Sequence, residues 1–304
     1  MSCKPPVEVC EMMANGGKGR AQQTILTTLL LAFLAGAYIA MGGFLAVRVS
    51  AGMPAEIWGS LAKFMFGAVF PVGLVLVLIV GADLFTGNCM TVSSALFSGR
   101  TTLGGIAKSW SLSWIGNLVG SLFVAYFLCY STGLILEATK VGDVVKNMPW
   151  AVGIVKIANM KTGLDFDVAF WRAVGCNWMV CLAIWVAAAS TDVVSKIVAL
   201  WFPIMAFAAI GFEHSVANMF FIPLGILAGN DPSYIAFAQS AEGAALHAPL
   251  VTATWGKFFI NNLIPVTLGN IVGAVVFVSG IYGVIYGKKV TASEQNSISA
   301  SKEL

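Results

Sequence analysis

The chain has 304 residues, of which 58% are hydrophobic and 10% are charged, and its formal net charge at pH 7 is +3. About a quarter of the residues in a soluble domain are charged, so this composition indicates an integral membrane protein. The basic residues form no run of the kind that binds nucleic acid. Because hydrophobic segments fill most of the chain, we expect one membrane domain and no separate soluble domain.

Residues 1–23 precede the first long hydrophobic segment, and we interpret them as a cytoplasmic N-terminal segment. Charged residues are scattered through this segment, and no small-residue cleavage site follows the first hydrophobic run, so it does not resemble a secretory signal peptide. The stretch VEVCEMMANGGKGRAQ could form a short amphipathic helix that lies on the membrane surface. The charged residues in question are Lys4, Glu8, Glu11, Lys18 and Arg20.

Hydrophobic runs of about twenty residues are long enough to cross a bilayer as a helix. Such runs predict membrane spans at 24–47, 61–96, 110–132, 167–189, 195–229 and 258–286. The second and fifth runs are too long for one straight crossing and carry polar residues midway, so each predicts a crossing interrupted by irregular backbone. We therefore expect an all-α transmembrane domain of six helices over 24–287.

An even number of crossings places both termini on the same side of the membrane. The positive-inside rule puts that side in the cytoplasm, which predicts a multi-pass protein of the cell (inner or plasma) membrane. The bias is modest, because the 133–166 loop on the opposite side also carries lysines. The polar segment 288–304 is expected to be a disordered cytoplasmic tail. The basic residues on the cytoplasmic side are Lys18, Arg20, Arg100, Lys108, Lys196, Lys288 and Lys289.

The two halves of the membrane domain share motifs. Both interrupted spans contain the pattern Gly-x-acid-x-x-x-x-Asn, which begins at Gly81 in the second span and at Gly211 in the fifth. The third and sixth spans share Gly-Asn-x-Val-Gly, which begins at Gly116 and at Gly269. A repeat of three crossings enters the membrane in opposite directions in its two copies. The sequence therefore predicts an inverted repeat, with a site near the midplane where two broken helices meet.

Polar residues of these motifs are expected to stabilise the two breaks. Asp83 and Glu213 occupy matching positions, and we predict that they tie the broken helices together through hydrogen bonds to backbone N–H groups. Contact of either carboxylate with a substrate is the less favoured alternative. Non-helical backbone at membrane depth needs internal partners. The asparagines expected to support the same breaks are Asn88, Asn218, Asn117 and Asn270.

Glu213 and His214 are the only ionisable side chains between Lys196 and Asp231. An ionisable group at bilayer depth is unfavourable and usually faces a cavity or a partner, so it marks a candidate functional site. Glu213 has a counterpart in the first half, whereas His214 aligns with Leu84 and has none. An isolated histidine in a hydrophobic segment is more often a packing residue. Here the adjacent acid, the midpoint position and the repeat favour a role in a pore.

The cysteines and the second histidine indicate no further site. Four of the six cysteines lie in hydrophobic segments and none forms a Cys-x-x-Cys pair, so we expect them to pack as small hydrophobic residues. The two histidines lie far apart, and scattered thiols give no ligand spacing, so we expect no metal and no other cofactor. His247 lies in a loop of small residues and is expected at the surface.

The segments GADLFTGN, GFEHSVANMFFIPLGI and NNLIPVTLGNIVG resemble the formate/nitrite transporter family, and most closely its formate-channel branch. The resemblance covers essentially the whole membrane region. It implies an aquaporin-like fold of two inverted three-helix repeats, assembled as a homopentamer with one pore in each protomer. It also implies that the substrates are monovalent anions of weak acids: formate, nitrite, hydrosulfide, lactate or acetate.

The resemblance also implies roles for individual residues. His214 matches the central pore histidine, and Thr86 matches a threonine that faces it from the loop that breaks the second span. Lys161 falls where the family has a lysine near the outer vestibule, but the residues after it depart from the family pattern. Lys161 is therefore either an ordinary loop lysine or an electrostatic lure for anions. The residues that match pore-lining positions are Phe70, Leu74, Leu84, Phe207, Asn177 and Val180.

A fully charged anion is strongly disfavoured in a narrow hydrophobic pore, because it loses its hydration there. Histidine has an unperturbed pKa of about 6.5, near working pH. His214 could therefore pass a proton to the anion, let the neutral acid cross and be reprotonated. Desolvation would favour the neutral ring, whereas Glu213 or an arriving anion would favour the charged ring. Thr86 could donate a hydrogen bond to the same anion oxygen, and half-helix N-termini add partial positive charge.

These observations predict a channel or transporter for formate or a similar small anion, with protons as the second species transported. Nitrite and hydrosulfide remain alternatives, since a small pore with one histidine and one threonine suits all three. A water or glycerol channel is disfavoured because the chain has no Asn-Pro-Ala. An intramembrane enzyme that uses His214 as a base is also disfavoured. Ser215, its neighbour, would point to another face of a helix, and the chain has no Gly-x-Ser-x-Gly motif.

Overall fold

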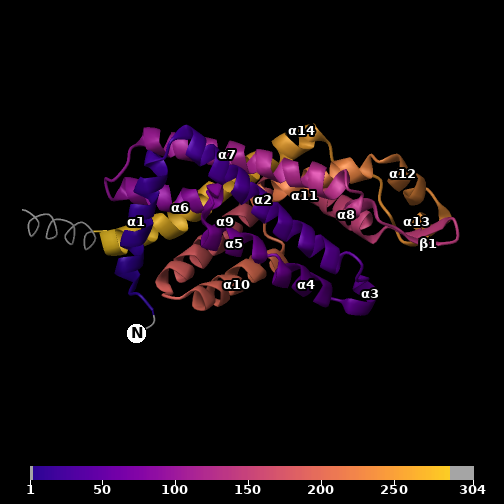
Figure 1. Ribbon diagram of the computed structural model, residues 1–304, viewed down its shortest axis with the longest axis horizontal. Coiled ribbons are helices and arrows are strands. Elements are labelled where there is room, and N and C mark those ends of the chain that lie inside the picture. The colour runs from indigo at the N-terminus through magenta and orange to yellow at the C-terminus, as the bar shows by residue number, and fades with distance from the viewer. Residues whose placement is uncertain (1–2, 288–304) are drawn as a thin grey trace, which may run out of the picture.

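The computed structural model describes residues 3–287, which form an elongated bundle of helices (Figure 1). Helix α1 and the last described helix lie at one end of the bundle, and β1, α12 and α13 lie at the other (Figure 1). The two described ends of the chain therefore share one end of the molecule. The expected tail, 288–304, lies outside the described residues. Within residues 3–287, six helices are long and apolar enough to cross a membrane: Ile25–Ser50, Leu61–Gly81, Leu103–Tyr130, Phe166–Ala189, Val193–Ile210 and Trp255–Gly287.

The first half of the chain forms an N-terminal helix followed by three crossings. Short polar side chains start two of the crossings, as is usual at helix N-termini: Thr24 accepts a hydrogen bond from the N–H of Thr27, and Thr102 accepts one from Gly105. The helices of this half are α1 (Pro6–Gln22), α2 (Ile25–Ser50), α3 (Ala55–Trp58), α4 (Leu61–Val69), α5 (Val72–Leu76), the π-helix η1 (Val77–Gly81), α6 (Phe85–Phe97), α7 (Leu103–Phe123) and the π-helix η2 (Val124–Tyr130).

Helix α1 packs against the protein through one face. Val9, Met13 and Ala14 are buried, and a Cβ added to Gly17 would lie 1.9 Å from the carbonyl oxygen of Thr91 on α6. The stretch for which the sequence suggested a helix on the membrane surface is thus helical, but its inner face is covered by α6. Helix α1 consequently packs against the membrane domain.

The prediction of a loop at 133–166 is wrong, because most of this segment has regular structure. Its last part is α8, which begins at Pro149 and buries Ile154, Val155 and Ala158. These residues recur at helical spacing, but the run is too short and too rich in lysine to be recognised as a membrane span. The elements of the segment are the 3-10 helix η3 (Leu134–Leu136), the antiparallel pair β1 (Thr139–Val141) and β2 (Val144–Asn147), and α8 (Pro149–Thr162).

The second half of the chain repeats the plan of a short helix followed by three crossings, with α8 in the place of α1. The fifth crossing of the chain is completed by α11, a shorter apolar helix. His247, in the loop before the last crossing, is exposed as the sequence predicted. The helices of this half are α9 (Phe166–Ala189), α10 (Val193–Ile210), α11 (Ser215–Gly229), α12 (Pro232–Ala238), α13 (Ala241–Ala245), α14 (Trp255–Lys257), the π-helix η4 (Phe258–Leu263), α15 (Ile264–Ala274) and the π-helix η5 (Val275–Gly280).

Glycines bring crossing helices into close contact in both halves. A Cβ added to Gly120 of α7 would lie 2.0 Å from the carbonyl oxygen of Phe33 on α2. A Cβ added to Gly273 of α15 would lie 2.4 Å from the carbonyl oxygen of Val174 on α9. Small residues at helix interfaces permit this approach of two backbones. The shared Gly-Asn-x-Val-Gly motif therefore packs the third span on the first and the sixth on the fourth.

Gly120→Ala should lower the stability of the protein by about 1–3 kcal/mol, because the added methyl group meets backbone that cannot move aside. Thermal unfolding of the detergent-solubilised protein measures this loss. Gly104→Ala, on the same helix, is the matched control, since its Cβ would meet only the hydroxyl oxygen of Thr102 at 3.6 Å. Equal unfolding temperatures for the two variants would show that α2 and α7 do not pack this closely.

Candidate functional site

The second and fifth spans are both interrupted at a glycine. Helix η1 ends at Gly81, whose φ is 91°, and residues 82–84 are not helical. Helix α10 ends before Gly211, whose φ is 90°, and residues 212–214 are not helical. Glycine adopts positive φ without the steric penalty of a side chain, which accounts for these two positions of the repeated motif. Each break exposes backbone groups that need partners within the protein.

Asn117 of α7 supplies those partners at the first break. Its side-chain oxygen accepts a hydrogen bond of 2.9 Å from the N–H of Phe85, the first residue of α6. Its side-chain nitrogen donates to the carbonyl oxygens of Ala32 and Asp83 at 2.8 and 3.0 Å. One buried amide therefore joins α2, the break and the start of α6.

Asn270 of α15 makes the equivalent bonds at the second break. Its oxygen accepts a hydrogen bond of 2.9 Å from the N–H of Ser215, the first residue of α11. Its nitrogen donates to the carbonyl oxygens of Ala173 and Glu213 at 2.8 and 3.0 Å. The motif repeat is thus matched by a repeat of hydrogen bonds, atom for atom.

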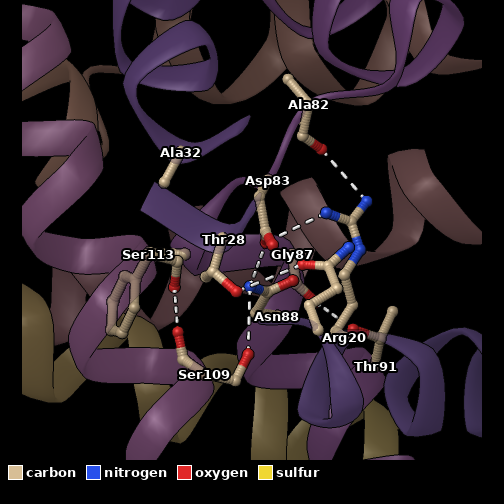
Figure 2. A network of polar contacts seen from close by, with 12 residues as sticks. Arg20, Thr28, Ala32, Ala82, Asp83, Gly87, Asn88, Thr91, Ser109 and Ser113 are labelled. Atoms are coloured by element: carbon tan, nitrogen blue, oxygen red, sulfur yellow. Dashed lines mark hydrogen bonds and ion pairs between the residues drawn. The ribbon is translucent and has the colours of Figure 1, made fainter. Parts of the chain in front are cut away.

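The carboxylate of Asp83 lies at the centre of a polar network that Figure 2 shows from close by. Arg20 of α1 approaches Asp83 Oδ1 to 3.1 Å with one guanidinium nitrogen and donates to the carbonyl oxygen of Ala82 at 3.1 Å with another. The amide of Asn88 donates to the same Oδ1. Asp83 is fully buried, so this charge-assisted pair replaces the hydration that the carboxylate has lost.

Glu213 has an equivalent set of partners. Its Oε1 lies 2.8 Å from Nζ of Lys161. Its Oε2 accepts hydrogen bonds from the amides of Asn218 at 2.7 Å and Asn262 at 3.3 Å. Only 10% of the Lys161 side chain and 0% of the Glu213 side chain are exposed, so the pair is buried.

The partners of the two acids correct the sequence prediction. We expected backbone N–H groups to hold Asp83 and Glu213, but the hydrogen bonds and ion pairs of their carboxylates are made with side chains. A buried carboxylate is stabilised more by a cation than by a neutral donor, which explains why each acid is paired with a basic side chain. The interpretation of Lys161 as a loop lysine is also wrong, because it lies in the last turn of α8. The sequence motifs did not identify Arg20 or Asn262 as partners of these acids.

The central contact of the site joins the two breaks. Oγ1 of Thr86 lies 3.0 Å from Nε2 of His214, and both side chains are buried. Nδ1 of His214 accepts a hydrogen bond of 3.1 Å from the N–H of Ala217 and so caps α11. Because Nδ1 acts as an acceptor, the ring is neutral in this arrangement and carries its proton on Nε2. That proton points toward Thr86.

The backbone of Thr86 is fixed by a hydrogen bond from Asn177 of α9. The Asn177 side chain donates to the carbonyl oxygen of Thr86 at 3.1 Å and to that of Asn270 at 2.7 Å. Asn177 was expected to line the pore. The structure instead places its side chain between the backbones of α6 and α15, where it fixes the position of Thr86.

A cavity of about 590 Å³, which we call the vestibule, opens on one side of His214; its lining includes Phe70, Lys161, Phe207, Asn218 and His214. A second, narrow cavity, of about 10 Å³, also lies next to His214. His214, Phe70 and Phe207 line both cavities, so His214 lies where the vestibule and the narrow cavity adjoin. The residues that line the narrow cavity are Ile39, Phe70, Leu74, Leu84, Val180, Ile204, Phe207 and His214.

Six of the residues predicted for the pore, His214 among them, therefore meet around the narrow cavity, and two isoleucines make up the rest of its wall. Ile39 and Ile204 were missed by the sequence analysis, because isoleucine in a membrane span gives no signal of its own. The ring of Phe207 lies 5.7 Å from that of Phe70 and 5.9 Å from that of His214, measured between centroids. A cluster of three rings thus closes this end of the vestibule.

Six membrane-length helices, two interrupted spans and a buried histidine beside a narrow hydrophobic cavity define a membrane channel or transporter. The sequence pattern of the Formate/nitrite transporter family matches residues 7–284, and the chain belongs to the formate/nitrite transporter family. This confirms the family that the motifs resemble and the assignment as a channel or transporter rather than an enzyme.

Similar proteins agree with this placement. The probable formate transporter of Methanothermobacter thermautotrophicus is 43% identical over 95% of this chain and 99% of its own length. The formate channel FocA of Escherichia coli (strain K12) is 33% identical over 92% of this chain and 94% of its own length. A solved structure described as a pentameric formate channel with formate bound has 32% identity and a TM-score of 0.71, covering 86% of this chain and 97% of that one. These similarities confirm the six-helix membrane fold.

Proposed function

We propose that this protein carries formate, or a similar small monovalent weak-acid anion, across the membrane, and that His214 exchanges a proton with the substrate. The buried contact between Thr86 Oγ1 and Nε2 of His214, a residue that lines both the vestibule and the narrow cavity, is the observation that carries this proposal. The formate-transporting relatives and the formate-bound channel support formate as the substrate.

The substrate meets two hydrogen-bond donors before it meets the hydrophobic constriction. The Nε2–H of His214 points toward the hydroxyl oxygen of Thr86 at 3.0 Å, so a carboxylate oxygen that accepts from both groups must replace this contact. Beyond them the passage is lined by Leu74, Leu84 and Val180. These side chains offer no hydrogen bond to replace the hydration of an anion, which makes a charged species unfavourable there.

Protonation of the anion to a neutral acid removes that barrier. A second proton on the His214 ring must occupy Nδ1, which displaces the N–H of Ala217 from its present contact. The arriving anion compensates by bringing negative charge beside the ring. The charged ring then gives a proton to the anion, the neutral acid crosses the constriction, and the ring is reprotonated from the vestibule. One proton and one formate ion therefore cross together as formic acid.

We also propose an oligomeric state for the protein and an orientation in the cell membrane. A solved relative is described as pentameric, and we infer a homopentamer with one pore in each protomer. Both described chain ends lie at one end of the molecule (Figure 1), which supports termini on the same side of the membrane. We assign that side to the cytoplasm from the loop charges, and the two halves to inverted repeats from their matched hydrogen bonds.

Flux through the reconstituted protein tests this function. Uptake of labelled formate, nitrite, hydrosulfide and glycerol into liposomes is followed at outside pH values from about 5 to about 8, the range over which histidine exchanges protons. We expect formate uptake that rises as the outside pH falls, because each formate ion needs a proton. Glycerol uptake without anion uptake would refute the proposal. Faster uptake of nitrite or hydrosulfide than of formate would change the assigned substrate.

Thr86→Val should slow formate uptake by about ten- to a hundredfold, because it removes one hydrogen bond to a charged group without changing the size of the side chain. Thr86→Ser, which keeps the hydroxyl, is the matched control and should retain most of the uptake. Initial rates of labelled formate uptake at one outside pH measure both. Equal rates for the valine and serine variants would exclude Thr86 as a donor.

A further inference from the structure

The vestibule has two cationic side chains that the proposed proton exchange does not use. Lys63 of α4 and Arg172 of α9 both line the 590 Å³ cavity that ends at His214. Lys63 is exposed and Arg172 is half-buried. They come from different halves of the chain, and neither belongs to the repeated motifs.

These two cations differ from Lys161, the third cation of the vestibule. The charge of Lys161 is neutralised by Glu213 at 2.8 Å. Among residues 3–287, no side chain or backbone group forms an ion pair or hydrogen bond with the charged end of Lys63 or of Arg172. Their positive charges are therefore available to a solute in the cavity.

No acidic residue is found among the described residues that line the vestibule. A cleft lined by charges of one sign and bounded by protein concentrates the electric field, and it raises the local concentration of the oppositely charged solute by about 10- to 1000-fold. The cavity is also next to the site of reaction. The backbone carbonyl of Arg172 accepts a hydrogen bond of 3.3 Å from the N–H of Glu213, the residue before His214.

We propose that Lys63 and Arg172 form an anion-collecting site in the vestibule, which binds a small monovalent carboxylate before it reaches His214. A guanidinium group matches a carboxylate with two parallel hydrogen bonds, and a lysine ammonium adds a point charge. The identity of the ligand rests on the proposed function, since the site collects the anion that His214 then protonates. The site supplies substrate but takes no part in proton exchange.

The first test is the salt dependence of formate uptake by the double variant Lys63→Gln/Arg172→Gln. At about 0.01 M ionic strength charges act over about 30 Å, and at 1 M over about 3 Å. We expect initial uptake at low salt to fall about tenfold, the lower end of the range for electrostatic concentration, and the difference from the wild type to vanish at high salt. Lys156→Gln, an exposed lysine of α8 outside the vestibule lining, is the matched control and should leave uptake unchanged.

The second test measures binding without transport. The ¹³C-formate line width is recorded at low salt with detergent-solubilised wild type, the double variant and Lys156→Gln. Broadening by the wild type and by Lys156→Gln that is lost in the double variant supports the site. Broadening that persists in the double variant, or is absent in the wild type, overturns it. A wild type that broadens the line through Lys63 and Arg172 but transports no formate refutes the proposed function and leaves the site standing.

Discussion

Replacement of His214 by glutamine should lower formate uptake by about 10²-fold or more and make the remaining uptake independent of outside pH. Glutamine keeps a hydrogen-bond donor of similar reach but cannot exchange a proton, and a positioned proton donor typically contributes 10²–10⁴-fold. Labelled formate uptake by liposomes at several outside pH values measures both effects. The wild type should take up more formate at lower pH, because the proton that crosses with formate is then more abundant.

The second histidine provides the control for this experiment. His247 is exposed in the loop before the last crossing, so His247→Gln should keep the rate and the pH profile of the wild type. A His214→Gln protein with an unchanged pH profile would remove the proton-exchange mechanism and leave the family assignment standing.

Lys161→Met should destabilise the protein by about 3–5 kcal/mol, the usual effect of removing one partner of a buried ion pair. The variant leaves the carboxylate of Glu213, which is 0% exposed, without its cation. The double variant Lys161→Met/Glu213→Gln should recover most of this loss, because a neutral amide can still accept the hydrogen bonds of Asn218 and Asn262. Thermal unfolding in detergent, followed by the loss of the folded oligomer, compares the variants.

Lys156→Met is the matched control on the same helix. Lys156 is exposed, and its replacement should change stability by less than about 0.5 kcal/mol, as for most surface substitutions. If the double variant is as unstable as Lys161→Met, the loss comes from the packing of the lysine chain and not from an unpaired charge.

The parts of the fold that follow local rules could be predicted from the sequence. Membrane-length hydrophobic runs gave the six crossings, and the repeated glycine motifs marked the positions at which the second and fifth are interrupted. Gly81 and Gly211 were informative because a positive φ restricts the choice of residue at a single position. The sequence marked His214 as a candidate because an ionisable group is rare at membrane depth.

The parts that depend on long-range packing could not be predicted in the same way. Lys161 and Glu213 are far apart in the sequence, and only the packing of α8 on α11 brings them together. Arg20 reaches Asp83 in the same manner from α1 (Figure 2). The structural repeat therefore includes a short helix in each half that supplies a cation to a buried acid. The two short helices share no motif that would have revealed this in the sequence.

The two cations of the vestibule also could not be predicted from the sequence. Lys63 and Arg172 lie on different helices and in no shared pattern, so their common environment becomes visible only as a cavity lining. The lining of the narrow cavity could be predicted only in part. The resemblance to the family identified Phe70 and Phe207, whereas Ile39 and Ile204 needed the structure.

Simultaneous recording of formate uptake and luminal pH tests most directly whether formate crosses together with a proton. Liposomes containing the wild type receive a formate gradient at fixed membrane potential, and protein-free liposomes correct for diffusion of formic acid through lipid. We predict luminal acidification that follows formate uptake one for one, and uptake that does not change when the potential is altered. Formate uptake that carries current and leaves the luminal pH unchanged would contradict the account.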